Sequence, residues 1–253
     1  MTASNLAVCF APSLFNVISL KSSNSPSLLR NKKQTGVPDS KEVLEPAHEC
    51  LVFMIDNSKS LFSECREKFR NWNVCPSING IDIAYKKTDD LLRQWMCLTE
   101  MEAPPEEVLN RILTQRSLWD EDLHESSVVE KLDNHTDIFQ YTRNSMPPHP
   151  CRHYCLIRSW RTNLSKGACL LLTYSVRHPK VKISGVEGII LESHYLIEPC
   201  GAGKSRVTHI IREDTKGRSV KWYNLSYGKI NANFMDRLRT SFQQVASGPE
   251  TKL

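Results

Sequence analysis

The chain has 253 residues, of which 40% are hydrophobic and 24% charged, a globular composition that argues against wholesale disorder. This length allows one large domain or two small ones, and no apolar run of about 18 residues predicts a transmembrane helix. The formal net charge of +5 is mild and does not by itself indicate nucleic-acid binding.

The first third of the chain changes character twice. Residues 1–20 resemble the interior of a folded domain, because apolar side chains such as Leu6 and Phe10 have no partner surface nearby. Residues 21–41 are rich in Ser, Asn, Pro, Lys and Gly, which predicts a flexible linker. Helical spacing of apolar residues then predicts helices over residues 42–72.

The remainder predicts strands with a helix near each end. A helix begins at Pro105, with Glu106 and Glu107 at its positive end. Apolar residues at spacings of three and four predict a last helix over residues 229–245. Strands are predicted over residues 81–85, 92–100, 136–143, 152–161, 168–177, 188–198 and 205–212. Most gaps are too short for crossover helices, so we expect one curved antiparallel sheet closed by the last helix.

Charge is distributed unevenly along the chain. Residues 100–137 carry eleven acids and three bases, whereas residues 203–240 carry nine bases and three acids. These regions could be two solvated faces, or the basic region could face an anionic membrane or lipid headgroup.

Several short patterns resemble known functional motifs but do not meet their requirements. Residues 201–205 (GAGKS) lack the glycine that a P-loop needs, since Glu198 occupies its place, and a tight turn between strands fits better. Cys151, His153 and Cys155 lack a second ligand cluster for zinc. The nine scattered cysteines indicate reduced cytosolic thiols. We expect no catalytic residue, metal or cofactor.

One predicted strand carries an unusual charge. Arg152, Tyr154, Leu156, Arg158 and Trp160 share one face of it. If this face is buried, Arg158 needs an anionic partner, either a lipid headgroup or an internal carboxylate. If the face is solvated, Arg158 is simply exposed.

Several spaced motifs over residues 61–248 resemble START (StAR-related lipid-transfer) domains. They are Leu118-Trp119-Asp120, the segment Arg152 to Arg158, the run Asp214-Thr-Lys-Gly217 with Lys221-Trp-Tyr-Asn224, and Arg237-Leu-Arg239. The sequence departs from the family pattern at three positions, His153, Arg218 and Val220, where other residue types are usual.

The front of the chain has a counterpart too. Residues 1–15 resemble a late helix of RhoGAP domains, and residues 161–168 and 195–201 resemble the deleted-in-liver-cancer family of RhoGAP–START proteins. The resemblance suggests a splice form, a fragment or a gene-model product. The expected divisions are a RhoGAP remnant (1–20), a linker (21–41), the last RhoGAP-type helix (42–62), a START domain (63–249) and a tail (250–253).

The resemblance implies an α+β helix-grip START fold, with an apolar tunnel beneath the C-terminal helix. A tunnel binds a lipid or sterol by removing its tail from water, worth about 0.8 kcal/mol per methylene. Arg158 would pair with a polar group of the ligand. The expected lining is Trp95, Tyr154, Leu156, Arg158, Trp160, Leu170, Leu172, Tyr174, Phe234 and Leu238. A parity error of one residue would exchange these strand residues for the opposite face.

The implied function is a non-catalytic lipid-binding module of a Rho-signalling protein. The alternative is a START-shaped interaction or scaffold module without bound lipid. Expected partners are a lipid or sterol, an anionic membrane surface and, for the full-length parent, a Rho-type GTPase, but not nucleic acid. The expected location is the cytoplasm, with peripheral membrane association. Asn5 would be a remnant of the GTPase contact, without GAP activity, because the family's arginine finger lies upstream of it.

Overall fold

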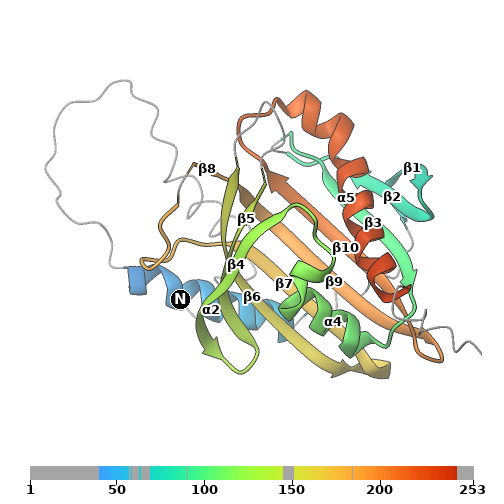
Figure 1. Cartoon of the computed structure of the whole chain (residues 1–253), viewed down its shortest axis with the longest axis horizontal. Coiled ribbons are helices and arrows are strands. Elements are labelled where there is room, and N and C mark those ends of the chain that lie inside the picture. Colours follow the sequence, from blue (N-terminus) through green and yellow to red (C-terminus); the bar gives the residue numbers. More distant parts are fainter. Residues whose placement is uncertain are drawn as a thin grey trace, which may run out of the picture.

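The computed structural model describes residues 40–56, 58, 63, 69–89, 91–144, 151–183 and 185–243. Within them, helices lie on both faces of one ten-stranded sheet (Figure 1). The helices are α2 (Ser40–Asp56), α4 (Pro105–Thr114) and α5 (Val220–Gln243), with 3-10 turns η1 (Arg116–Leu118) and η2 (Ser165–Gly167). The strands are β1 (Asn73–Ile78), β2 (Ile81–Lys86), β3 (Gln94–Met101), β4 (Leu123–Asp133), β5 (Thr136–Arg143), β6 (Arg152–Leu164), β7 (Ala168–Ser175), β8 (Val186–Glu187), β9 (Ile189–Gly201) and β10 (Lys204–Asp214).

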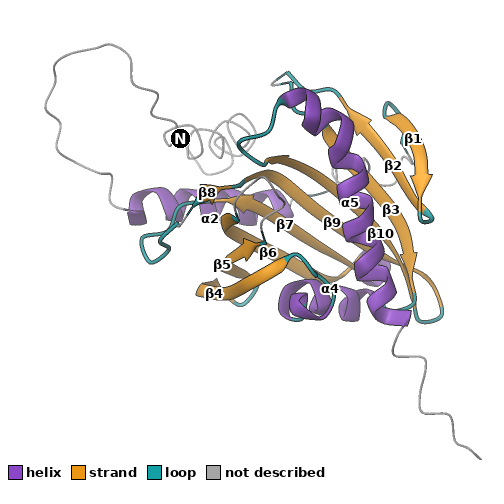
Figure 2. Cartoon of the chain, turned by 45° about the horizontal axis from the view of Figure 1, so that its top comes forward, coloured by secondary structure: helices purple, strands orange, loops and turns teal. Residues whose placement is uncertain are grey.

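The sheet has the order β1-β2-β3-β10-β9-β7-β6-β5-β4, and each neighbouring pair is antiparallel. The short strand β8 adds a parallel pairing to β6. Figure 2 shows α5 lying along one face of the curved sheet, with α4 near its end. The expected α+β architecture, a curved antiparallel sheet closed by the C-terminal helix, is confirmed.

The concave face carries the larger of two hydrophobic clusters. Buried residues of β3, β6, β9 and β10 pack there against Val108, Leu109 and Ile112 of α4 and Met235 and Leu238 of α5. The apolar residues of α4 recur at spacings of one, three and four, so they share a single helix face. This cluster lies between the sheet and α5.

The convex face carries a second cluster beneath α2. Ala47, Cys50, Leu51 and Ile55 of α2 are buried against residues of β6 and β7, including Ile157. Central strands therefore have apolar side chains on both faces, which removes the alternation that would distinguish the two faces.

Besides the two-residue β8, the strands that the sequence did not predict lie at the two edges of the sheet. β4 is mostly exposed and rich in polar residues, and β1 contains Pro76. Edge strands with charges or proline lack the hydrophobic pattern that identifies a central strand.

The ends of two expected helices also differ. The helical prediction up to Trp72 is wrong at residues 69–72, where Phe69 and Asn71 have φ angles of 62° and 63° and form a turn. The last helix begins at Val220 rather than at residue 229. The hydroxyl of Ser219 accepts a hydrogen bond of 3.1 Å from the backbone N–H of Trp222, which caps this earlier start.

Some expectations concern residues outside the described ranges. These are the RhoGAP remnant over residues 1–20 with Asn5, nearly all of the linker over residues 21–41, and the tail over residues 250–253. The proposed domain divisions therefore stay predictions.

Candidate functional site

An internal cavity lies between the concave face of the sheet and α5. It holds about 70 Å³ of free space. Its apolar and aromatic lining consists of Ile112, Trp119, Phe139, Tyr141, Leu156, Leu171, Ile190, Tyr195, Ile211, Tyr227, Ile230 and Phe234. Its polar lining consists of Arg116, Arg143, Arg158, Thr173, Ser193, His209, Glu213 and Asn231. The cavity is therefore small, and its wall is more polar than that of the expected tunnel, in which Arg158 was the one charged residue.

A second pocket adjoins the cavity near the start of α5. It encloses about 220 Å³ and shares Arg143, Glu213, Tyr227 and Ile230 with the cavity wall. Arg152, Arg218 and Asp122 also line this pocket, so its wall carries both positive and negative charge.

The expected lining residues of β6 and α5 lie on the inner side of the molecule. Leu156, Arg158 and Phe234 line the cavity itself. Tyr154 lines the adjoining pocket, and Leu238 is fully buried in the concave cluster.

Two expected tryptophans face inward without touching the cavity. Trp95 is buried in the concave cluster, against Gly228 of α5. Trp160 is partly buried and packs against the edge of the same cluster, beside the ring of His135.

The expected lining residues of β7 lie on the opposite face. Leu170, Leu172 and Tyr174 belong to the convex cluster beneath α2, so their placement toward the cavity is wrong. In the antiparallel register, Arg158 lies opposite Thr173 and Trp160 opposite Leu171. Directly opposed residues share a face, which makes the inner residues of β7 the odd-numbered ones.

Arg158 has an internal partner. Its Nε and Nη2 donate hydrogen bonds of 2.8 and 2.7 Å to the two carboxylate oxygens of Asp137. Its Nη1 donates to the carbonyl of Leu113 at 3.2 Å, and the guanidinium stacks on Phe139 at 3.8 Å. Both charged side chains are only 6% exposed. The alternative in which Arg158 is exposed to solvent is excluded, and the anionic partner within the chain is Asp137.

Arg116 is held near the closing helix. Its Nε donates to Asp120 at 2.8 Å, and its guanidinium lies 3.9 Å from the centre of the Tyr141 ring. Burial would lower the pKa of Arg116, but Tyr141 and Asp120 raise the pKa above its ordinary value. Arg143 lies farther along the wall and donates to Asp122 at 3.3 Å.

Glu213 is the acidic residue on the cavity wall. It is 2% exposed, and its carboxylate accepts a hydrogen bond of 2.5 Å from the hydroxyl of Tyr154 and another from that of Tyr227. Burial and the nearby Glu213 raise the pKa of both tyrosines, so they remain protonated donors at neutral pH. This buried acid is thereby satisfied without an external cation.

Ser193 and His209 form a polar pair on neighbouring strands. The hydroxyl of Ser193 lies 3.0 Å from Nε2 of His209, and the His209 ring stacks on Tyr195 at 3.9 Å. The sequence analysis did not single out either residue. The available signal was alternation along β10, where His209 and Glu213 fall on the same face as the apolar Val207 and Ile211.

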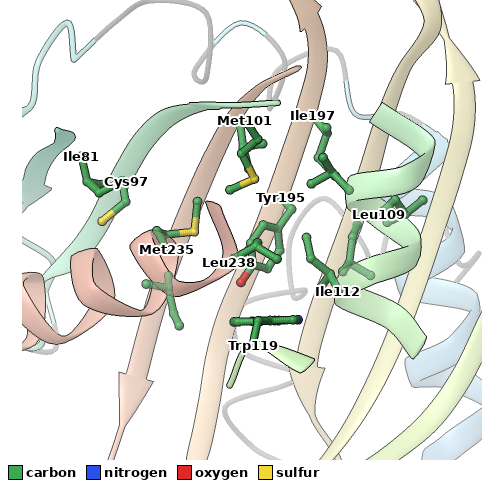
Figure 3. Close-up of a cluster of buried hydrophobic side chains, with 14 of the residues drawn as sticks. Ile81, Cys97, Met101, Leu109, Ile112, Trp119, Tyr195, Ile197, Met235 and Leu238 are labelled. Carbon is green, nitrogen blue, oxygen red and sulfur yellow. The ribbon is translucent and has the colours of Figure 1, made fainter. Parts of the chain in front are cut away.

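Side chains of α5 close the cavity. Figure 3 shows Met235 and Leu238 directed toward Tyr195 of β9, with Ile112 of α4 beyond them. Phe234 packs edge-on against Trp119, with ring centres 4.7 Å apart. The amide of Asn231 donates to Sγ of Cys97 at 3.2 Å. One helix thus separates the interior from solvent on this side.

The other short patterns have structural roles. Residues 201–205 form the turn between β9 and β10, with Gly203 at a φ of 71°, as expected. Among the described residues, no three His, Cys, Asp or Glu side chains are grouped to hold a metal ion. No helix in these ranges is long and apolar enough to cross a membrane.

The fold and cavity define a class of protein: a helix-grip domain, in which a curved antiparallel sheet and a C-terminal helix enclose an internal site. The START domain family model matches residues 53–247, and the chain belongs to the START domain family.

Curated relatives are RhoGAP–START proteins. StAR-related lipid transfer protein 13 of Homo sapiens is 40% identical over 309 aligned positions, covering 100% of this chain and 28% of the relative. Rho GTPase-activating protein 7 of Mus musculus is 39% identical, covering 96% of this chain and 27% of the relative. The chain thus spans less than a third of these proteins, and the longer alignment includes positions without a counterpart here.

Solved structures agree with the fold. The structure described as "Human StarD13 (DLC2) lipid transfer and protein localization domain" is 47% identical, has a TM-score of 0.67, and covers 73% of this chain and 95% of that one. Human STARD10 is 21% identical, with a TM-score of 0.67 and coverage of 85% and 84%, and supports the fold alone.

Proposed function

We propose that this chain is a non-catalytic module that binds one lipid or sterol between the concave face of the sheet and α5. The observation that carries the proposal is the cavity between the sheet and α5, whose wall on one side is a single helix. Its apolar and aromatic lining suits a hydrocarbon body, and its polar groups suit the polar part of an amphiphile. The names of the relatives support a lipid ligand.

Binding would require α5 to move. The free space of about 70 Å³ is well below the roughly 300–1,000 Å³ of pockets that hold drug-sized ligands. The adjoining pocket at the start of α5 supplies a further 220 Å³ along the same wall. Displacing α5 would join these spaces, so we assign this helix the role of a lid.

The surface near the start of α5 fits an anionic membrane. Leu225 is 71% exposed and Leu91 is 70% exposed, and the amide of Asn224 donates to the carbonyl of Leu91 at 3.0 Å. The exposed bases Lys221 and Lys229 lie on the same helix. Exposed apolar side chains beside lysines favour association with an anionic bilayer.

The membrane contact can be tested with liposomes of phosphatidylcholine and phosphatidylserine. Replacing Leu225 by Asn should reduce cosedimentation several-fold, because it removes the inserting side chain. Leu118→Asn is the control, since Leu118 is 64% exposed but lies on η1. Equal loss in both variants would contradict docking at the start of α5.

We further propose that the chain acts within Rho signalling, in the cytoplasm and at membranes, as the lipid-binding part of a Rho GTPase-activating protein. This rests on the similarity to Rho GTPase-activating protein 7. A Rho-type GTPase would be the partner of the longer parent.

The second candidate is an interaction or scaffold module without lipid. The small cavity and the closed Arg158–Asp137 pair favour it, because the ion pair occupies part of the inner face without any ligand. The two candidates differ in the volume that becomes available when α5 moves.

Native mass spectrometry of the chain purified from cells, followed by extraction from mixed liposomes, separates them. Lipid binding predicts one lipid per chain. If the folded protein carries no lipid and extracts none, the scaffold function is supported instead.

A further inference from the structure

His209 has an unused hydrogen-bonding atom at the cavity wall. The side chain is 1% exposed, and its Nδ1 has no hydrogen-bond partner. Several buried polar atoms in the described ranges share this property, but among them only Nδ1 of His209 belongs to a residue lining this cavity. An unpaired buried polar atom costs free energy, so its presence at a binding cavity points to a ligand.

The ring of His209 is held in a fixed orientation. Tyr195 stacks on it with an angle of 8° between the planes, and Ser193 occupies Nε2. Burial lowers the pKa of His209, and the side chain of Asn231 on α5 approaches the ring closely enough to oppose this shift. Asn231 still leaves Nδ1 without a hydrogen bond of normal geometry, since its amide donates to Sγ of Cys97. Moving α5 would take Asn231 away and leave Nδ1 facing the enlarged cavity.

The charged groups of the wall are already paired. Asp120, Asp122 and Asp137 contact Arg116, Arg143 and Arg158, and tyrosine hydroxyls satisfy Glu213. An anionic ligand would have to compete with a carboxylate in a buried ion pair, which is costly. Burial lowers the pKa of His209 to about 3, so the ring is uncharged at neutral pH and supplies no cation.

We propose that Nδ1 of His209 is the hydrogen-bonding subsite for an uncharged hydroxyl group of the bound lipid, with Ser193 positioning the ring. A hydroxyl can donate and accept, so it fits either neutral tautomer of His209. The preferred ligand is therefore a neutral, hydroxyl-bearing lipid, and Arg158 does not bind its polar group. This inference rests on the proposed lipid-binding function.

The first test uses the unmodified chain. Its histidines are labelled with ¹⁵N, and the ring nitrogens are followed by NMR during titration with 1-octanol, octane or octanoate. Octanol should shift Nδ1 of His209, whereas octane should not. Octanol should also bind roughly two- to twelve-fold more tightly than octane, the range for one neutral hydrogen bond.

The second test compares two histidine variants. His209→Phe keeps an aromatic ring but removes the subsite. It should lower octanol affinity by the same roughly two- to twelve-fold without changing octane affinity. His194→Phe is the matched control. Its Nε2 lies 2.7 Å from the hydroxyl of Tyr174 and its Nδ1 is unpaired, but it faces α2 on the convex side.

The outcomes separate the two proposals. If neither octane nor octanol binds, the proposed lipid-binding function fails and the subsite fails with it. If both bind equally, if Nδ1 of His209 does not shift, or if octanoate binds most tightly, the subsite alone is overturned. The wild-type titration decides this even if His209→Phe does not fold.

Discussion

Gly228 of α5 lies directly against the indole of Trp95 on β3: a Cβ atom at residue 228 would lie 2.3 Å from Cζ3 of Trp95. No side chain larger than hydrogen fits there without moving the helix or the ring. A glycine in the middle of a helix lowers helix propensity by about 1 kcal/mol relative to alanine, so close packing is the reason it is tolerated here. The seating of the lid thus depends on this contact.

Gly228→Ala should displace α5 from the sheet. We expect a net loss of about 1–3 kcal/mol in the free energy of unfolding, because overpacking outweighs the gain in helix propensity. Urea denaturation measures it. Gly201→Ala is the control, since the nearest atom to its new Cβ is 4.0 Å away. Equal stability of both variants would contradict the tight seating of α5.

Removing one partner of the Arg158–Asp137 pair should destabilise the chain strongly. Arg158→Leu or Asp137→Leu leaves an uncompensated buried charge, and we expect each to cost about 3–5 kcal/mol. In the double variant, the loss in the free energy of unfolding should be much smaller than the sum of the two single losses. A double-mutant cycle measured by urea denaturation gives this difference. The exposed Lys204–Glu102 pair provides a reference with little or no coupling. Additive losses at residues 158 and 137 would argue against the pair.

Stability should fall as the solution is acidified from pH 7.5 to 5. Burial lowers the pKa of His194 to about 4 and that of His209 to about 3, against 6.5 in the unfolded chain. Between these values the unfolded state binds more protons, so the free energy of unfolding decreases as the pH drops below 6.5. Each histidine should account for about 2 kcal/mol at pH 5. Urea midpoints across this range should depend less on pH in His194→Phe, and an unchanged slope would contradict a buried neutral His194.

Cysteine alkylation should follow burial. Cys151 is exposed, whereas burial raises the pKa of Cys97 and Cys155 to about 12 and suppresses their thiolate forms. Brief treatment with iodoacetamide, followed by peptide mass spectrometry, should therefore modify Cys151 well before the other two. In urea, where the chain is unfolded, the three cysteines should be modified at similar rates. Early labelling of Cys97 in the native chain would mean that α5 opens readily.

The chain expressed as these 253 residues should not accelerate GTP hydrolysis by a Rho-type GTPase. The arginine finger that accelerates this reaction by roughly 10³–10⁵ is expected upstream of Asn5. A phosphate-release assay with purified GTPase measures the rate. A rate increase in that range would show that another group replaces the finger.

Sequence patterns were sufficient to predict the positions of most central strands of the sheet. β5 matches its predicted range, and β2, β6 and β10 extend slightly beyond theirs. β9 begins one residue later and ends three residues later than predicted. These strands have apolar residues and clear turn signals, so local preference and burial agree. In the edge strands β1 and β4, local preference and burial do not agree in this way. Each of them has a neighbouring strand on one edge only.

The sequence by itself determined the fold class and the family, and it left open whether Arg158 is buried or exposed. It could not determine which face of β7 is inside, because α2 buries Leu170 and Leu172 as fully as the concave cluster buries Leu171. Only the tertiary structure decided that Arg158 is paired with Asp137, that the cavity is small, and that Nδ1 of His209 is left unpaired at its wall. These properties depend on the register between strands and on the seating of α5, which bring together residues far apart in the chain.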